Sequence, residues 1–213
     1  MARQVRAEVT RASVLMAAAD VFVRLGYANA GLNEIIEQSG VTKGALYFHF
    51  SSKEDLARGV IDEGQVRLTA GVTSVSDGPT PALEALVALS YVAIEAASSD
   101  PIVAAMLRLQ HEIGDYQGTD GNVVTAWQQA FERLVGRAVD EGDIRTEEDV
   151  PPETLATFLR GSLLGTHVVA TATNAFDELP RRMERVWYFI LPGLVEPSKL
   201  VYFRQFASRR LLR

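Results

Sequence analysis

The chain contains no cysteine among its 213 residues. Disulfide scaffolds, thiolate metal sites and cysteine nucleophiles are therefore excluded, and the composition suits a reducing, cytoplasmic setting. Histidine is almost as scarce, since the chain has only His49, His111 and His167. No pair of them has the His-x3-His or His-Glu-x2-His spacing of a helical metal motif, so we expect no metal site and no cofactor.

Long apolar runs are also missing. The stretch at residues 14–22 is interrupted by Asp20 and has no small-residue cleavage site, so it predicts no secretion signal. No run reaches the roughly 18 apolar residues of a membrane-spanning helix, so we expect no membrane insertion. A Gly-x-Ser-x-Gly elbow and a glycine-rich phosphate loop are absent too, which removes two common enzyme signatures.

The residues that are present suit a globular protein with one domain or two small ones, because 47% are hydrophobic and 23% are charged. The formal charge is -6, but it is unevenly spread. Residues 1–53 hold six basic and four acidic side chains, whereas the rest hold 15 basic and 23 acidic ones. A mildly basic head on an acidic body suits a protein whose head alone touches phosphate, although chance scatter of surface charge gives the same pattern.

Apolar residues recur at helical spacing throughout, and no segment alternates as a strand would, so the fold class predicted is all-α. The first helix is expected at about residues 11–25, ending at Gly26. Two short helices follow at about 32–39 and 43–48, and a long one at about 53–72, opened by a Ser51/Glu54 capping box. Proline and glycine breaks then delimit helices at about 82–97, 101–113, 122–141, 153–176 and 180–191.

The two short helices and the turn Ser39-Gly40-Val41 between them match a helix-turn-helix, whose second helix enters the major groove of DNA. Thr42 stands where an N-cap belongs, with its hydroxyl placed to accept from the amide of Ala45. Lysine can read guanine, and threonine, tyrosine and histidine can hold phosphate oxygens. We expect an exposed side with Lys43, Gly44, Tyr47 and His49, and an inner side with Leu46, Phe48 and Phe50.

Residues 41–56, Val-Thr-Lys-Gly-Ala-Leu-Tyr-Phe-His-Phe-Ser-Ser-Lys-Glu-Asp-Leu, strongly resemble the signature of TetR-family transcriptional regulators. Residues 18–22 and Gly26-Tyr27 fit the same family, and the likeness covers residues 8–68. The opening Met-Ala-Arg-Gln, the core Lys-Gly-Ala-Leu-Tyr-Phe-His-Phe and Trp127 resemble more narrowly the γ-butyrolactone receptor branch, which controls antibiotic production. Gly31 departs from the family, whose members usually carry a capping Thr or Ser there, so one phosphate contact is in doubt.

The resemblance implies a helix-turn-helix DNA-binding domain at residues 1–68, with its motif at about 31–50, and a helical ligand-binding and dimerisation domain at 69–213. Lys43 is expected at a base or phosphate, and Lys53 at a phosphate, against the alternative of solvated lysines. Arg3 and Arg6 precede the expected first helix as a flexible arm would. The full set of expected DNA contacts is Arg3, Arg6, Thr42, Lys43, Gly44, Ala45, Tyr47, His49 and Lys53.

In the body, the resemblance alone makes Trp127 a wall of a ligand pocket, whereas Trp187 is expected in the core. A mostly apolar cavity with a few polar groups suits a lactone or furan signal, with core packing as the alternative for each residue. The residues expected around the small-molecule effector are Gln65, Leu86, Tyr91, Met106, Leu109, Gln110, Trp127, Phe131, Ser162 and Thr166.

Small residues on the expected 153–176 helix allow close approach of another helix, so this helix and the next are the expected homodimer face. The small residues are Gly161, Ser162, Gly165, Ala170 and Ala172. The basic tail from Lys199 is interpreted as a solvated helix end, a second nucleic-acid patch being the alternative.

The function expected is a homodimeric, cytoplasmic repressor that leaves a palindromic double-stranded DNA operator when a small signal binds. Two alternatives remain open at this point: a multidrug-responsive TetR-type repressor, and a helical-bundle enzyme that uses His111 and Glu112.

Overall fold

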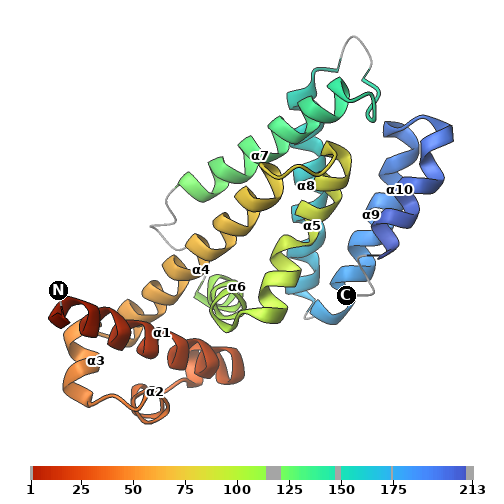
Figure 1. Cartoon of the computed structure of the whole chain (residues 1–213). Helices are drawn as coiled ribbons and strands as arrows, with labels where there is room; N and C mark the ends of the chain where they lie inside the picture. The colour runs from red at the N-terminus through yellow and green to blue at the C-terminus, as the bar shows by residue number, and fades with distance from the viewer. Residues whose placement is uncertain (1, 114–120, 147–149, 174, 210–213) are drawn as a thin grey trace. The chain divides into compact units, whose positions relative to one another are not determined.

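The computed structural model describes residues 2–113, 121–146, 150–173 and 175–209, without the side chains of residues 2, 3, 121–124 and 171. Every regular element in these ranges is helical, which confirms the all-α prediction (Figure 1). The elements are α1 (Ala2–Asn29), α2 (Leu32–Ser39), α3 (Lys43–His49), α4 (Lys53–Ser76), α5 (Ala82–Ser99), α6 (Pro101–Ile113), α7 (Gly121–Asp140), α8 (Pro152–Ala172), a 3-10 turn (Phe176–Glu178), α9 (Leu179–Leu194) and α10 (Pro197–Arg209).

The helices form two compact units. Unit 1 comprises residues 1–68 and 95–119, and unit 2 comprises residues 69–94 and 120–213. The chain therefore passes from one unit to the other within α4 and again within α5. Helix α6 lies within the domain expected at residues 69–213, but its contacts group it with the helix-turn-helix.

Unit 1 is built around α1. The side chains of Val14, Leu15, Ala18 and Phe22 are buried on one face of this helix, at the spacing of three and four that places residues on a single side. The same unit buries Ile35 of α2, Leu46 of α3, and Leu56 and Val60 of α4. Buried apolar residues from all four helices give the helix-turn-helix a core of its own.

The turn between α2 and α3 has the expected chemistry. Gly40 adopts a left-handed conformation, with φ of 67° and ψ of 10°, and ends α2 by donating its amide to the carbonyl of Glu37. Thr42 Oγ1 accepts from the amide of Ala45 at 3.2 Å, which confirms the predicted N-cap of α3. The angle between α2 and α3 is therefore set by local hydrogen bonds.

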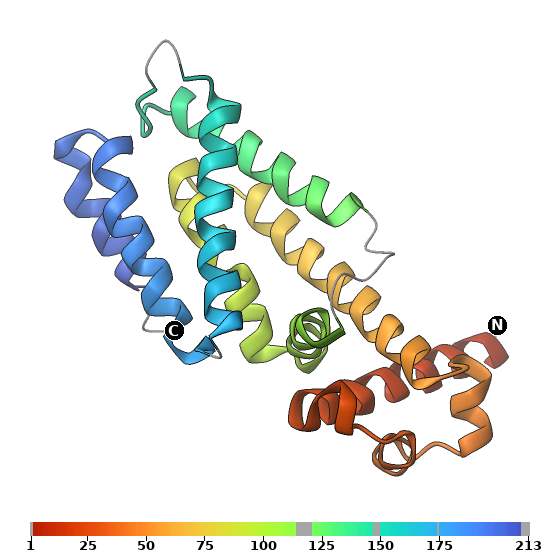
Figure 2. The ribbon, with the colours of Figure 1, turned by 180° about the vertical axis from the view of Figure 1, so that it is seen from behind.

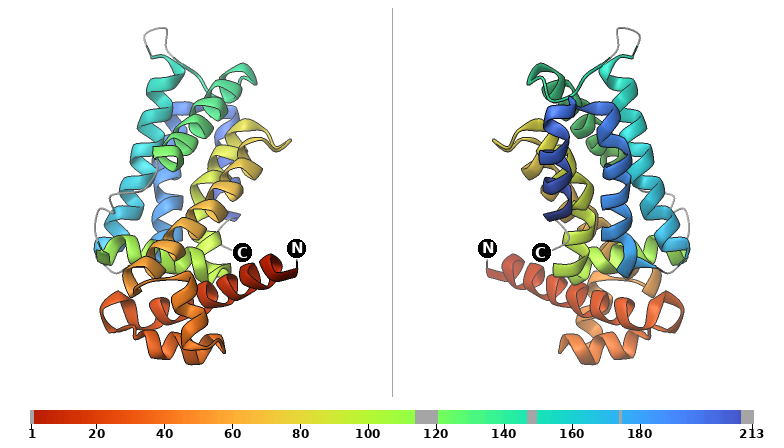
Figure 3. Two further views of the ribbon diagram at one scale, coloured as in Figure 1. Left: turned by 90° about the vertical axis from the view of Figure 1, so that its left-hand side faces the viewer. Right: turned by 90° about the vertical axis from the view of Figure 1, so that its right-hand side faces the viewer.

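Helix α1 differs from the prediction at its start, whereas the predicted break at Gly26 is present, with φ of 77°. It begins at Ala2 rather than near Arg11, so the chain around Arg3 and Arg6 is helical and the flexible-arm expectation is wrong. No described side chain from Gln4 to Thr10 is buried, and the first turns of α1 project beyond α2 and α3 (Figure 3). A helix without a buried face carries no apolar periodicity, which is why the sequence did not reveal it.

The start of α4 also needs a correction. Ser52, not Ser51, caps the helix, because Ser52 Oγ accepts from the amide of Asp55 at 3.0 Å. The Asp55 carboxylate in turn accepts from the amide and hydroxyl of Ser51 at 2.8 and 3.0 Å. Glu54, the expected partner in the capping box, instead forms an ion pair with Arg58.

Unit 2 contains α7 to α10 and most of α5. Within it α9 packs against both α8 and α10, as seen from behind in Figure 2. Trp187 of α9 is completely buried, and its indole Nε1 donates to Ser90 Oγ of α5 at 2.9 Å. Trp187 is thus a core residue, as expected.

Helix α5 alone among the described helices is long and apolar enough to cross a membrane. More than half of it, 56%, is buried inside the protein. Its buried residues run from Ala82 to Val92 with a break only at Glu84, which is the pattern of a core helix.

Candidate nucleic-acid interface

The candidate interface is the outer side of α3. Leu46 is buried and anchors the seven-residue helix on unit 1. Because a helix turns by 100° per residue, this anchoring directs the side chains on either side of Leu46 outward. Six of the expected DNA contacts are thereby brought together on one short helix and its cap, with Thr42, Lys43, Gly44 and Tyr47 exposed and Ala45 and His49 half-buried.

Gly44 lies on this outer side, and a methyl group at its Cα would meet no atom of the described part of the chain within 4 Å. The interior of the protein therefore does not require glycine here, and the absence of a side chain leaves room for an approaching surface. Lys43 extends over the Tyr47 ring, with Nζ 5.9 Å from the ring centroid. A cation and a phenol group are thus adjacent on the exposed face.

Phe48 lies on the outer side of α3. It was expected to pack inward, but 78% of it is exposed, and its ring meets the half-buried His49 edge to face at 5.0 Å. Helical spacing predicts this exposure. Leu46 and Phe50 are four residues apart and share one face, whereas Phe48 is two residues from each and lies on the other side. An exposed aromatic ring therefore joins the candidate interface.

Lys53 at the start of α4 already has partners within the protein. Its Nζ donates to the carbonyls of Tyr27, Ala28 and Ala30 at 2.8, 3.3 and 3.1 Å. It also lies 4.6 Å from the centroid of the Tyr27 ring. A phosphate at Lys53 would compete with these hydrogen bonds. In this structure the side chain stabilises the end of α1.

The arginines of α1 are separated from α3 along the chain. Arg6 is exposed on the projecting turns of α1, and the side chain of Arg3 lies outside those that the structure describes. Arg11 is placed over the ring of Phe50, 5.6 Å from its centroid.

The expected effector residues of unit 1 are mostly buried. Met106 and Leu109 of α6 are buried, and Gln110 is half-buried. Gln65 of α4 is only 8% exposed, and its Nε2 has no hydrogen-bond partner among the residues that the structure describes. A buried amide donor without a partner costs free energy unless a ligand or water completes it.

The expected effector residues of unit 2 include one stacked pair. Trp127 is half-buried and stacks on the buried ring of Phe131, with centroids 6.4 Å apart and planes at 21°. Leu86 and Tyr91 are buried in α5. Ser162 and Thr166 are half-buried on α8, where the Thr166 hydroxyl donates to the Ser162 carbonyl at 2.9 Å.

Glu112 is occupied by structural partners rather than placed as a catalytic base. It forms an ion pair with Arg108 at 2.6 Å and accepts from the amide of Tyr27. Burial alone would raise the pKa of Glu112, but the bonds from Arg108 and Tyr27 and the charges of Arg108 and His111 lower it below its ordinary value of 4.5. In the described part of the chain, no three His, Asp or Glu side chains form a group that could hold a metal.

An exposed apolar face lies on the two helices predicted to form the dimer. Phe158, Leu164, Val168 and Val169 of α8 are each more than half exposed, and Phe189 of α9 is 78% exposed. Methyl groups built at Gly161 and Gly165 would meet no atom of the described residues within 4 Å, so both glycines face outward as well. This outward face, α8 with Phe189, is called the α8/α9 face below.

Known proteins resemble the chain over most of its length. A family model of bacterial regulatory proteins of the tetR family matches residues 14–60, and one of the tetracycline repressor-like C-terminal domain matches residues 80–196. The A-factor receptor protein of Streptomyces griseus is 31% identical over 204 residues, covering 96% of this chain and 70% of the relative.

Two solved structures share the fold over 96% of this chain and 97% of their own. One is a gamma-butyrolactone receptor, an ArpA-like protein, with 34% identity and a TM-score of 0.72. The other is CprB from Streptomyces coelicolor in complex with its biological operator sequence, with 32% identity and a TM-score of 0.70. The chain has a helix-turn-helix whose second helix is exposed, and its helical C-terminal domain matches as well. It therefore belongs to the tetR family of bacterial regulatory proteins and is a transcriptional regulator rather than an enzyme.

Proposed function

We propose that the protein is a cytoplasmic, homodimeric repressor that binds a palindromic DNA operator and leaves it when a small diffusible signal binds. The signal is of the γ-butyrolactone, butenolide or furan type, and the genes controlled include those of antibiotic biosynthesis. The observation that carries the proposal is the exposed outer side of α3 in a chain that resembles γ-butyrolactone receptors over nearly its full length.

In this proposal α3 lies in the major groove. Lys43 reads a base edge, Gly44 and Ala45 allow the backbone to approach, and Thr42, Tyr47 and His49 hold phosphates. Phe48 adds an apolar contact, for which the methyl group of thymine is a suitable partner in the groove. Arg3 and Arg6 approach the phosphates from the projecting turns of α1. Lys53 stabilises the end of α1 through its hydrogen bonds to backbone carbonyls.

A seven-residue recognition helix buries too little surface for specific binding, so two copies are needed. The α8/α9 face supplies the contact, because its outward glycines permit close approach and its exposed side chains supply apolar area. A two-fold dimer then requires two half-sites about 34 to 36 Å apart, and so a palindromic operator.

The effector proposal rests on the stacked pair of Trp127 and Phe131 in unit 2. Taken by itself, unit 1 offers the Gln65 amide, which has no hydrogen-bond partner among the described residues. A half-buried indole offers a flat apolar wall, and an amide N–H can donate to the carbonyl of a lactone. Leu86, Tyr91, Met106 and Leu109 are proposed as apolar contacts, and Gln110, Ser162 and Thr166 as polar ones. No cofactor is required.

Release from DNA requires that the effector bind the non-docking state more tightly. A hundredfold loss of operator affinity corresponds to about 2.7 kcal/mol of differential binding. A gel shift on the upstream DNA of its own gene, with a synthetic alkyl-substituted γ-butyrolactone, tests the proposal. Wild type should release the DNA, whereas Trp127→Ala should bind DNA normally and fail to respond.

Tyr202→Ala provides a control for the loss of a large, exposed aromatic side chain of unit 2, because Tyr202 lies on α10, outside the effector residues and the α8/α9 face. If Trp127→Ala releases DNA at the same lactone concentration as wild type, Trp127 is not an effector contact. If hydrophobic drugs release wild type and lactones do not, the protein is a multidrug-responsive repressor instead.

A further inference from the structure

The bend that ends α1 lies directly before the helix-turn-helix. Gly26 interrupts the helix with φ of 77° and ψ of 170°, and a single further turn to Asn29 leads into α2. In an uninterrupted helix the amide of Tyr27 would donate to the carbonyl of Val23, four residues earlier. The break at Gly26 leaves these two backbone groups in need of other partners.

Both partners come from the last turns of α6. The Glu112 carboxylate accepts from the Tyr27 amide, and the Arg108 guanidinium donates to the Val23 carbonyl, each at 2.5 Å. Arg108 Nε also donates to Glu112 Oε1 at 2.6 Å, so the two side chains form one unit. The bend at Gly26 removes one helical hydrogen bond, and the ion pair provides new partners for the two backbone groups.

The fit between the bend and the ion pair is close. A methyl group at the Cα of Gly26 would lie 2.7 Å from Glu112 Oε1 and 2.9 Å from the Arg108 guanidinium. Only a residue without a side chain allows the pair to reach the backbone here, and the positive φ favours glycine as well. From the opposite direction, Lys53 holds the carbonyls of Tyr27, Ala28 and Ala30.

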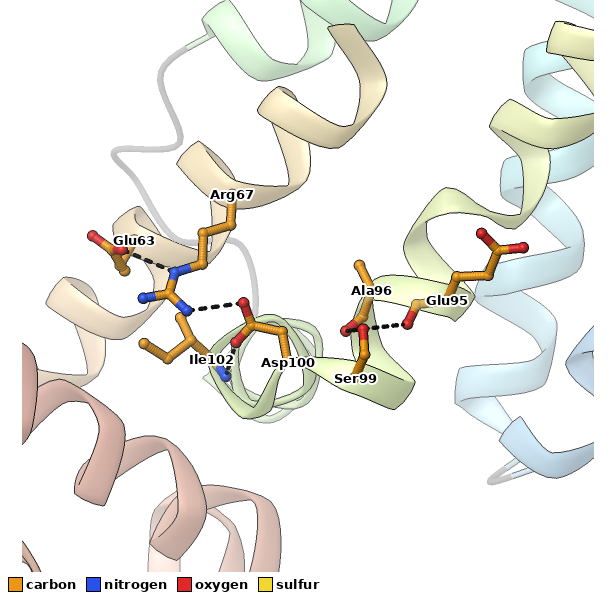
Figure 4. A network of polar contacts seen from close by, with 7 residues as sticks. All are labelled: Glu63, Arg67, Glu95, Ala96, Ser99, Asp100 and Ile102. Carbon is orange, nitrogen blue, oxygen red and sulfur yellow. Dashed lines mark hydrogen bonds and ion pairs between the residues drawn. The ribbon is translucent and has the colours of Figure 1, made fainter. Parts of the chain in front are cut away.

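The other end of α6 is fixed to α4. Asp100 Oδ1 accepts from the Ile102 amide and caps α6, while Asp100 Oδ2 binds Arg67 of α4 at 2.9 Å (Figure 4). Arg67 also binds Glu63 at 2.9 Å. One turn away, a methyl group at Gly64 would lie 2.6 Å from Met106 Cβ, so the two helices are in direct contact.

We propose that Arg108 and Glu112 are positioning residues for operator binding: by holding Val23 and Tyr27 they fix the bend before α2, and thereby the direction of α2 and α3. The proposal rests on the proposed function, because it assigns the pair to the docking of α3 on an operator.

The test compares two alanine variants by fluorescence anisotropy on operator and scrambled DNA. Glu112→Ala removes the acceptor for Tyr27, and Glu178→Ala removes the acid of another i,i+4 pair, Glu178–Arg182 of unit 2. We expect Glu112→Ala to lower operator affinity about tenfold, because that is the effect of losing one charge-assisted hydrogen bond. Scrambled DNA should bind within about twofold of wild type, and Glu178→Ala should match wild type on both DNAs.

An exchanged pair separates positioning from mere stabilisation of α6. Arg108→Glu combined with Glu112→Arg keeps an i,i+4 ion pair but places a donor against the Tyr27 amide and an acceptor against the Val23 carbonyl. We expect this variant to bind operator as weakly as Glu112→Ala does. Thermal unfolding curves should show that both variants are folded. Restored affinity in the exchanged variant, or wild-type affinity in Glu112→Ala, would overturn the proposal.

A lactone titration separates this proposal from the proposed function. If wild type binds operator but no lactone releases it, the effector class is wrong, and the operator affinities still decide the role of the pair. If wild type shows no preference for operator over scrambled DNA, the proposed function fails and the positioning role falls with it.

Discussion

Two lysines near the helix-turn-helix carry the same charge in different surroundings. Lys43 is exposed on α3 beside Tyr47, whereas Lys53 donates to three carbonyls at the end of α1. An exposed cation can meet a base, but one that caps a helix end contributes to folding as well. Residue type alone therefore does not define a role at the interface.

Replacing these lysines by alanine should give different results. Lys43→Ala should cost about 1 to 3 kcal/mol of operator binding and relax base preference, because a base contact is lost. Lys53→Ala should weaken binding to all sequences alike and also lower the melting temperature, because the carbonyls of Tyr27, Ala28 and Ala30 lose their donor. Anisotropy titrations and thermal unfolding measure the two effects, and equal losses on every DNA for both variants would remove Lys43 from base readout.

Gly31 is a second position where a single residue has a testable effect. It occupies the N-cap of α2 with φ of -101° and ψ of 137°, makes no side-chain cap, and has open space at its Cα. Gly31→Ser should stabilise the protein by about 0.5 to 1 kcal/mol, through a new cap and a less flexible unfolded chain. Urea unfolding checks this, and a loss of stability would show that the site does not accept a side chain.

At the level of helices, the sequence predicted what depends on local chemistry. The bounds of α2 and the cap at Thr42 were predicted correctly, because caps and apolar spacing act within one or two turns. The projecting start of α1 was missed, since it buries nothing. The carbonyl partners of Lys53 and the contact between Glu112 and Tyr27 were missed for a different reason: these partners lie 23 to 26 and 85 residues away along the chain.

The contact between α6 and α1 should make stability depend on pH in the acid range. The pKa of Glu112 is lower in the folded protein than its ordinary value of 4.5. The contribution of Glu112 to the free energy of unfolding is therefore complete at pH values above that ordinary value. It is lost as the pH falls through the lowered pKa.

Unfolding by urea at about pH 7 and about pH 3, for wild type and Glu112→Gln, measures this contribution. Wild type should be the more stable at the higher pH, and the difference should shrink at the lower one. A difference that does not change with pH would show that the Glu112 carboxylate contributes nothing through its charge.

At the level of the whole molecule, DNA recognition depends on pairing two chains. The α8/α9 face exposes apolar side chains around two outward glycines, so a charge there should prevent association. Val168→Glu should give a monomer that binds operator far more weakly, because one short helix cannot hold the site. The exposed Val66 of α4 provides the matched control, since Val66→Glu adds the same charge elsewhere.

Analytical ultracentrifugation of the two variants decides the location of the interface. A Val168→Glu protein that remains dimeric would place the interface on another surface.

The central claim is that this protein binds a specific two-fold operator through α3. Fluorescence anisotropy on the upstream DNA of its own gene, across a range of salt concentrations, tests it most directly. We expect at least about a thousandfold preference over scrambled DNA, and an affinity that falls with salt in proportion to the phosphate contacts. Equal affinity for both DNAs at every salt concentration would contradict the account.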